Sequence, residues 1–517
     1  MDTHNATVAA ISSKVSAFHA SSTPFRIYHG STLSTRTSSR QKSRIIDTSS
    51  LNHVLRFNTA DKTVLVEPNV PMDALVDATM PHGLVPKVVM ELPNITVGGG
   101  FAGTSGESSS FRHGLFDRGI RGIEIVLGNG DVVWAARDNE HRELFFACAG
   151  SCGSLGVITL VEMELMDAKP WVELEYHAVQ SIDEAVQLCA QSAKDPSIEY
   201  IDGIMYSLTK GVIMTGRLRA DASPHPIRSF DKPSDPWLYI DAEEILNNLL
   251  TSPPSQSPRP PTFKQSIPLK PYLFRYDRGV FWSGLRAFTY FLTPFNALTR
   301  YLLDPFMRSR TMIHALHRSG LASQALIQDL AVPFDKTDEF IRWTDQKTGL
   351  WPLWLCPVRK APRGEESFSM GGMTGGTGSG NFDEELLMDV GIWGMGPKNP
   401  TSFIALNRAF ERKITDLNGL KCLYAHAYYT EEEFWGIYDK EKYDGLREKY
   451  HAVGLPSVYE KVKVDLKGVA GPRENRQRES WGEWVVRTFW QTWPLGGLYG
   501  VASATKGLLV ESDFLLK

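Results

Sequence analysis

The chain has 517 residues, a net charge of −4 at pH 7, 42% hydrophobic residues and 22% charged residues. This length predicts two to four domains with ample chain to bury large cores, and the composition is that of an ordinary globular protein. With no excess or run of basic residues, a nucleic-acid-binding role is excluded. The five cysteines provide no zinc-ligand set, so we expect free thiols in a reducing compartment and no metal site.

The first 22 residues carry apolar side chains spaced as on one face of a short helix. They lack the basic region followed by a continuous apolar core that a signal peptide requires. No window reaches the roughly 18 uninterrupted apolar residues of a membrane span. We therefore expect an intracellular protein, and peripheral contact with a membrane stays open.

Taken in chain order, residues 1–168 predict an α+β domain of short strands and helices. The N-terminal helix is followed by short strands with a turn at residues 60–62, and then by a helix that begins at Pro71. Two apolar strands joined by residues 128–130 form the clearest hairpin. A helix, a tight glycine turn and an alternating strand end the domain.

Residues 171–470 predict a second α+β domain that starts with a strand, a helix and a strand pair. It contains a proline-rich loop at 251–262 and a glycine-rich loop at 369–383. The aromatic, arginine-containing region 272–307 predicts a buried helical part, and the alternative is an amphipathic surface for a membrane or a lipid. The Trp-rich tail, 471–517, is expected to be ordered only if it docks on protein or membrane.

The stretch at residues 92–114, LPNITVGGGFAGTSGESSSFRHG, combines bare glycine amides with hydroxyl side chains. Such a run forms an anion-binding concavity, and a diphosphate is its natural occupant. A P-loop is excluded because no G-x-x-x-x-G-K-[ST] occurs, and a dinucleotide-binding turn is disfavoured because a hairpin follows the glycines. A flexible linker is the alternative, but apolar segments flank the stretch on both sides.

In this order the elements resemble the FAD-binding domain of the vanillyl-alcohol oxidase (PCMH) type. The resemblance implies that the first turn, the glycine-rich stretch and the later GSCGSLGVIT turn together hold FAD. The residues it assigns to FAD binding are Gly30, Ser31, Thr32, Leu33, Thr96, Gly98, Gly99, Gly103, Thr104, Ser105, Gly106, Ser108, Gly156 and Val157.

Five blocks of the sequence indicate a more specific family: ITVGGGFAGTSGESSSFRHGLFD, GSCGSLGVI, YSLTKGVIMTG, WPLWLCP and LYAHAYYTEEEFW. Together these are similar to the Δ24-sterol reductase family (seladin/Diminuto type). That family implies reduction of a C=C bond in the side chain of a sterol, with FAD and NADPH. We therefore expect a hydrophobic sterol or terpenoid substrate, and a location in the cytoplasm or at the endoplasmic reticulum membrane. The sequence departs from the family in its N-terminus, which lacks an apolar anchor, in the 369–383 insertion and in the Trp-rich tail.

Covalent attachment of the flavin can be tested on the sequence. Relatives that tether FAD use a His inside the first turn or a Cys just before the glycines. Here residues 93–95, Pro-Asn-Ile, occupy the second place, and His29 precedes its glycine. We expect noncovalent FAD.

Reduction of an isolated alkene needs a well-placed proton donor as well as a hydride. The family-like blocks offer Glu433, Tyr429 and Tyr206 as catalytic residues, with His426 and Asp389 as further candidates. Each also has a structural interpretation, as a packed tyrosine or as a glutamate on a solvated helix face.

Two other functions keep the same fold. The first is an FAD-linked oxidase or dehydrogenase of a small alcohol or natural product. The second is a non-catalytic scaffold that keeps FAD for structure. The sequence makes no prediction of the oligomeric state.

Overall fold

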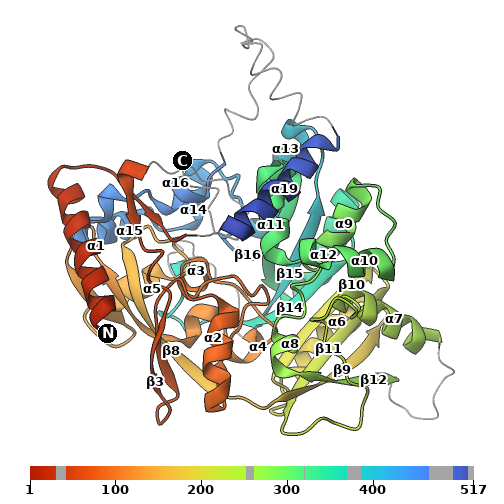
Figure 1. Ribbon diagram of the computed structural model, residues 1–517. Helices are drawn as coiled ribbons and strands as arrows, with labels where there is room; N and C mark the ends of the chain where they lie inside the picture. Colours follow the sequence, from red (N-terminus) through yellow and green to blue (C-terminus); the bar gives the residue numbers. More distant parts are fainter. Residues whose placement is uncertain (31–41, 252–260, 320, 369–385, 465–492, 511–517) are drawn as a thin grey trace.

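The computed structural model describes residues 1–30, 42–251, 261–319, 321–368, 386–464 and 493–510. Two main β-sheets with helices packed against them make up these residues (Figure 1). This mixture confirms the predicted α+β class. The expected glycine-rich loop at 369–383, most of the proline-rich loop and most of the Trp-rich tail lie outside the described residues.

The first sheet has the strand order β3-β4-β8-β6-β7, with β5 also paired to β8, and every pair is antiparallel. The predicted turns at 60–62 and 128–130 join β3 to β4 and β6 to β7. A separate parallel pair joins β1 to β2. The strands are β1 Arg26–Tyr28, β2 Ile45–Asp47, β3 Val54–Asn58, β4 Thr63–Val66, β5 Leu84–Pro86, β6 Ile120–Val126, β7 Val132–Ala136 and β8 Val157–Asp167.

The second sheet is fully antiparallel, with the order β12-β9-β11-β10-β14-β15-β13-β16. The predicted strand at 171–179 and the strand pair that follows it occupy three neighbouring places in this order. The strands are β9 Trp171–Val179, β10 Tyr200–Ser207, β11 Lys210–Arg219, β12 Thr262–Pro268, β13 Ala325–Pro333, β14 Leu353–Arg359, β15 Leu386–Met395 and β16 Leu420–Lys421.

Both faces of the second sheet are apolar because helices cover each of them. Along β14, Leu353 and Leu355 point into one core, whereas Trp354 and Cys356 point into the other. This follows from the two-residue period of a strand. The first core is closed by α6 Ile182–Ser192, α12 Thr337–Thr348 and α13 Pro400–Asp416. The second is closed by α7 Leu238–Thr251, α8 Leu269–Leu273, α9 Ser283–Tyr290 and α11 Ser309–Arg318, and by side chains of the first domain.

Helices from the end of the second predicted domain return to the first sheet. Phe434, Tyr443 and Leu446 pack in the same core as Val64 and Val161. They belong to α14 Glu431–Ile437 and α15 Lys440–Lys449, and α16 Val458–Val462 joins them. The predicted boundary near residue 170 lies where the chain passes from one sheet to the other. From about residue 423 to residue 462, however, much of the chain packs with residues of the predicted FAD domain.

The N-terminal domain carries α1 Asp2–Ala20, α2 Met72–Thr79, α3 Val97–Gly103, α4 Ser110–His113 and α5 Arg142–Cys148. The helices expected at the N-terminus and after Pro71 are therefore confirmed as α1 and α2. Among the described helices, none combines the length and the apolar character needed to cross a bilayer.

The region predicted as a buried helical part, 272–307, is only partly buried. Tyr272, Tyr276 and Trp282 are core side chains, as predicted. Beyond α9, however, the polypeptide rises to the surface, where α10 Ala297–Leu303 has no buried residue. The region therefore begins with buried aromatic side chains and continues into the exposed helix α10.

Candidate functional site

The centre of the glycine-rich stretch is a short helix, α3, and not the open loop expected from its glycines. The Thr96 side chain caps it by accepting a hydrogen bond from Gly99 N at 3.1 Å. The amides of Val97 and Gly98 are also used, because they donate to Val70 O and Pro68 O at 3.0 and 2.7 Å. The expectation that these first amides are bare is therefore wrong, since capping and a neighbouring loop satisfy them.

Unpaired amides occur one turn later, after the helix ends at Thr104. Among the described residues, no acceptor pairs with the backbone amides of Ser105 and Gly106. Thr104 has a φ of 46°, so the backbone turns sharply here. Two successive free amides beside hydroxyl side chains suit an anionic group such as a diphosphate. The residues present thus fit FAD, with the anion site shifted toward Ser105.

The second glycine turn contacts the end of α3 directly. Gly150 N donates to Phe101 O at 3.1 Å, and Cys152 N donates to Ala102 O at 2.8 Å. From the other side, Lys461 Nζ of α16 donates to the carbonyls of Cys152 and Gly153. The structure therefore brings together two of the three segments that the resemblance assigned to FAD.

Gly156 has a packing reason to be glycine. A Cβ there would lie 2.6 Å from Ile125 Cδ1 and 2.9 Å from Val126 O, so only glycine lets β8 begin this close to β6. The adjacent Val157 opens β8 and is buried. In the first turn, Gly30 has a φ of 87° directly after β1. Ser31, Thr32 and Leu33 lie outside the described residues.

A row of carboxyl groups lies on the face of the second sheet that looks toward the glycine-rich stretch. Asp202 of β10, Asp389 of β15 and Asp329 of β13 are all buried. Asp389 is opposite Cys356 in the strand register, and Asp329 is opposite Gly391, two residues further along β15. Glu91 and Glu107 of the first domain complete the group, and Glu91 N donates to the Glu107 carboxylate at 3.2 Å. We call these five residues the carboxyl cluster.

The carboxyl cluster and the adjacent Tyr424 lie close to the predicted FAD segment. A Cβ on Gly106 would lie 3.5 Å from Asp389 Oδ2, and one on Gly103 would lie 3.8 Å from Tyr424 Cβ. The Tyr424 hydroxyl donates to Asp329 Oδ2 at 2.6 Å. One oxygen each of Asp202, Asp329 and Asp389 is buried without a partner among the described residues. Such orphaned acceptors are rare in a finished core and indicate a site for a ligand.

Positive charge in the cluster comes from Arg275, which is buried and donates to Asp202 Oδ2 at 2.8 Å. Tyr276 and Trp354 donate to the same oxygen. Asp202 Oδ2 therefore accepts hydrogen bonds from one cation and two neutral donors. This arrangement leaves the other four carboxyl groups with little compensating charge.

Three of the other carboxyl groups, those of Asp329, Asp389 and Glu107, have a raised pKa. Burial raises the pKa of Asp329 to about 7, although the hydrogen bond from Tyr424 opposes the shift. Burial also raises the pKa of Asp389 well above its ordinary value, and the charges of Asp329 and Glu91 raise it further. The pKa of Glu107 is raised by burial and by Glu91, against the field of Arg275. Carboxyl groups with raised pKa values are therefore gathered beside the predicted FAD segment.

The three residues predicted to be catalytic lie in three different places. Glu433 completes the capping box of α14 with Thr430 and pairs with Arg408 at 2.8 Å. Partial burial raises the pKa of Glu433, but the Thr430 amide and Arg408 outweigh it and hold the pKa below its ordinary value. A carboxylate of this kind suits a helix cap better than a proton donor.

The two predicted tyrosines pack in separate cores. Tyr429 belongs to the core of the first sheet. Tyr206 lies at the far end of β10, where its hydroxyl donates to Tyr239 O at 2.5 Å. Burial raises the pKa of both phenols well above the ordinary value. The structure therefore does not gather Glu433, Tyr429 and Tyr206 at the glycine-rich stretch, and their catalytic roles stay predictions.

The fold and the two joined glycine segments define a two-domain flavoprotein, and a family model described as an FAD binding domain matches residues 4–136. The Delta(24)-sterol reductase of Homo sapiens is 28% identical over 420 residues, which cover 80% of this chain and 76% of that protein. The Delta(24)-sterol reductase of Arabidopsis thaliana is 28% identical over 462 residues, 84% of this chain and 79% of that protein. Cytokinin dehydrogenase 7 of Oryza sativa subsp. japonica is 32% identical over a shorter match of 141 residues, 26% of this chain and 27% of that protein.

The protein is therefore an FAD-dependent oxidoreductase, homologous along four fifths of its length to Delta(24)-sterol reductases. The resemblance carried by the five sequence blocks is confirmed. The carboxyl cluster, in contrast, was missed by the sequence interpretation except for Asp389. The signal that could have found it was a single aspartate inside each of three otherwise apolar strands, in YIDGIM, LIQDLAV and LMDVGIW.

Replacing Gly98 by alanine is expected to destabilise the first domain and to lower its flavin content. The added Cβ would lie 2.6 Å from Pro68 Cβ and 3.0 Å from Pro68 O, and neither a proline ring nor a carbonyl can move aside cheaply. We expect a loss of about 1–3 kcal/mol in the free energy of unfolding, measured by denaturant titration. Gly119→Ala is the matched control, because nothing lies within 4 Å of its added Cβ. Equal losses in the two variants would contradict this account of α3.

The raised pKa of Asp329 predicts a pH dependence of stability. Because the folded state binds this proton more tightly than the unfolded state, this group's contribution is lost as the pH rises from about 4 to about 7. Asp329→Asn should make the fall in unfolding free energy shallower between pH 5 and pH 7, by up to about 1.4 kcal/mol per pH unit. Glu173→Gln is the control, because the pKa of Glu173 is lowered to about 2 and it stays charged throughout this range. A slope unchanged by Asp329→Asn would show that Asp329 is ionised in the folded protein.

Proposed function

We propose that this protein is an NADPH-dependent reductase of a C=C bond in an isoprenoid side chain. The bond that we favour is the Δ24 bond of a sterol or a related terpenoid. Hydride and proton add across the double bond, and NADPH is oxidised to NADP⁺. The observation that carries the proposal is the buried Asp389, whose pKa is raised by burial, beside Gly106 of the predicted FAD segment, in a protein homologous to Delta(24)-sterol reductases.

In this proposal the amides of Ser105 and Gly106, with the Thr104 and Ser108 hydroxyls, help to hold noncovalent FAD. Bound FAD would supply a hydride to one alkene carbon. The protein's own part is to exclude water and to deliver a proton to the neighbouring carbon. An isolated alkene is poorly polarised, so the acid must already be neutral and close when the hydride arrives.

Asp389 is assigned as the proton donor. It is 1% exposed, and its Oδ1 lacks a partner among the described residues, so that the oxygen is available to a bound substrate. Asp329 and Tyr424 act behind it as positioning residues. When Asp329 is charged, it discourages ionisation of Asp389 and so preserves the proton that is to be transferred.

The reaction is tested by anaerobic titration of the purified protein with NADPH, followed by addition of a Δ24 sterol. We expect bleaching of the flavin absorbance by NADPH, its recovery on addition of the sterol, and a product heavier by two hydrogens in mass spectrometry. Failure of NADPH to reduce the flavin would overturn the proposed reductant. Flavin reduction without a saturated product would overturn the substrate class.

Asp389→Asn is expected to slow alkene reduction by about 10²–10⁴-fold, because the amide cannot give up a proton. Reduction of the flavin by NADPH should stay unchanged, since that half-reaction needs no donor to the alkene. Single-turnover absorbance measurements separate the two steps. Asp117→Asn is the matched control, because Asp117 is equally buried, has its pKa raised to about 6 by burial, and lies outside the carboxyl cluster. A larger loss in Glu433→Gln than in Asp389→Asn would favour the assignment made from sequence.

A second candidate is an FAD-linked dehydrogenase or oxidase of a small alcohol or natural product. The match to a plant cytokinin dehydrogenase over about a quarter of the sequence favours it. Oxygen-dependent release of peroxide with an alcohol substrate, without any reaction with NADPH, would identify this alternative.

A further inference from the structure

Exposed apolar side chains are concentrated in two short segments outside the sheets. Fourteen large apolar side chains are exposed in the described part of the protein, and eight of them lie within residues 292–302 and 493–499. Scattered exposed leucines are normal on a soluble protein, but a contiguous group marks an interaction site. The eight are Leu292, Leu298, Tyr301, Leu302, Trp493, Leu495, Leu498 and Tyr499. We call them the apolar ridge.

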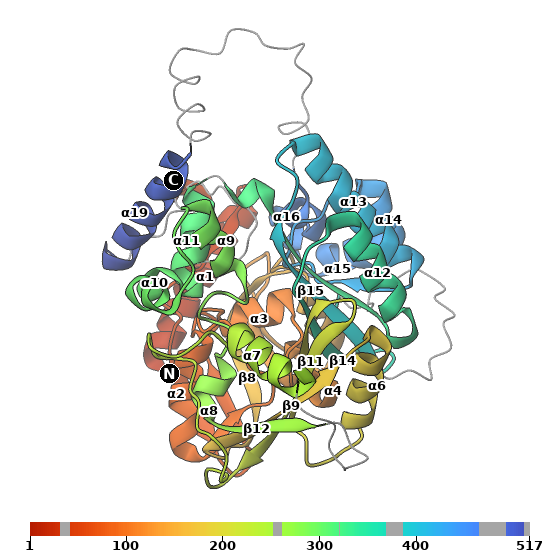
Figure 2. The same ribbon diagram turned by 90° about the vertical axis from the view of Figure 1, so that its right-hand side faces the viewer.

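The two segments of the apolar ridge are joined in space. Trp493 Nε1 donates to Tyr290 O at 2.5 Å, two residues before Leu292. A Cβ on Gly497 would lie 2.5 Å from the Tyr290 ring, and one on Gly500 would lie 2.6 Å from Ala315 O, so small residues let the helix α19 Leu495–Val510 pack against α9 and α11. Figure 2 shows α19, α11, α10 and α9 gathered on one side of the molecule. The exposed side chains therefore belong to one surface.

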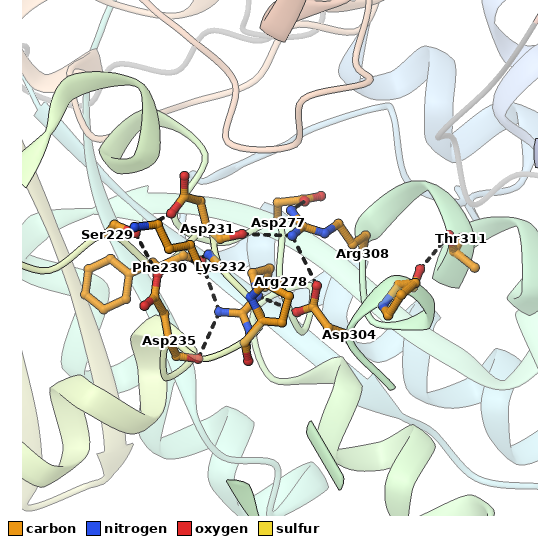
Figure 3. Close-up of polar contacts among 12 residues, drawn as sticks. Ser229, Phe230, Asp231, Lys232, Asp235, Asp277, Arg278, Asp304, Arg308 and Thr311 are labelled. Carbon is orange, nitrogen blue, oxygen red and sulfur yellow. Dashed lines mark hydrogen bonds and ion pairs between the residues drawn. The ribbon is translucent and has the colours of Figure 1, made fainter. Parts of the chain in front are cut away.

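The base of the apolar ridge is fixed by a buried ionic network. Arg278 Nε donates to Asp304 Oδ1 at 2.6 Å. The other two guanidinium nitrogens of Arg278 donate to backbone carbonyls within residues 230–236. Arg308 adds a contact to Asp304 at 3.1 Å (Figure 3). Above this network, α10 begins with a capping box of Asn296 and Thr299. The buried ion pairs at one end of α10 and the capping box at the other thus hold its leucines at the surface.

The two segments that form the ridge carry charges of one sign. Residues 279–303 and 493–510 contain no Asp or Glu, whereas they contain Arg286, Arg300 and Lys506. Asp304, at the end of α10, is buried and paired with Arg278. An apolar surface with cations and without acidic groups matches the chemistry of a bilayer with anionic headgroups.

We propose that the apolar ridge is a bilayer-docking surface, which places the leucines at the boundary between headgroups and acyl chains. The exposed Trp493, Tyr301 and Tyr499 are of the residue types enriched at this depth. A second copy of this protein fits the surface less well. Two facing ridges would bring Arg286 and Arg300 of both copies together, and the two ridge segments themselves hold no carboxylate to pair with them. This inference goes beyond the proposed reaction and does not depend on it.

Vesicle flotation of the full-length protein tests the proposal. We expect the protein to float with phosphatidylcholine vesicles and more completely when phosphatidylserine is included. The double variant Leu298→Asp/Leu302→Asp should lose about tenfold or more in partitioning, because two apolar contacts are replaced by charges that anionic lipids repel. The matched control is Ile227→Asp/Val453→Asp, since these side chains are 60% and 68% exposed and lie outside the ridge. The control should float like the wild type.

Three outcomes would overturn the proposal. The first is wild-type protein that stays at the bottom of the gradient with both vesicle compositions. The second is an equal loss of flotation in the ridge variant and the control. The third is a lipid-free dimer, seen by light scattering, that the ridge variant splits into monomers, since this would assign the ridge to contact between copies. Thermal melting of both double variants verifies that each is folded, and none of these measurements uses turnover.

Discussion

At Gly106 the backbone of the first domain meets the side chains of the second sheet, and the site depends on this close approach. The Cβ that Gly106 lacks would come within 2.8 Å of Val358 Cγ2. Two residues later, Ser108 O accepts a hydrogen bond from Ile201 N of β10 at 2.7 Å. This contact excludes water from the space between the sheets, and desolvation is the main cause of the raised pKa values of Asp389 and Glu107. The predicted cofactor segment and the raised pKa values beside it thus both depend on one packing constraint.

Local patterns in the sequence predicted most elements of the fold. The hairpin at 120–136 and the strands β9 to β11 were readable because their turn residues and apolar periods agree. Helix α3 was not readable, because three consecutive glycines have poor helix propensity. It forms because Thr96 caps it and because Pro68 and Val70 accept its first hydrogen bonds. These contacts come from segments that folding brings together.

Of the candidate site, the segments assigned to FAD were predicted from the sequence, but the carboxyl cluster was not, except for Asp389. The FAD segments were evident from the sequence, and the structure brings two of them into contact. The carboxyl cluster depends on strand register: Asp329 and Asp389 meet because β13 pairs with β15, although 60 residues separate them in the sequence. Sequence distance hides such a pair. Glu433 could have been interpreted differently, because Thr430-Glu-Glu-Glu433 is a capping-box pattern at the start of a helix.

The return of α15 and α16 to the first sheet has a consequence for how the polypeptide reaches its native state. Tyr443 donates to Ser154 Oγ at 2.7 Å, and Arg447 donates to Ser154 O at 2.8 Å, so residues almost 300 positions apart close one core. The second sheet is in effect an insertion within the first unit. During synthesis the first domain must therefore wait, with part of its apolar surface uncovered, until the whole second sheet has emerged. Closing contacts over such sequence distances is slow, and exposed apolar surface promotes aggregation in the interval.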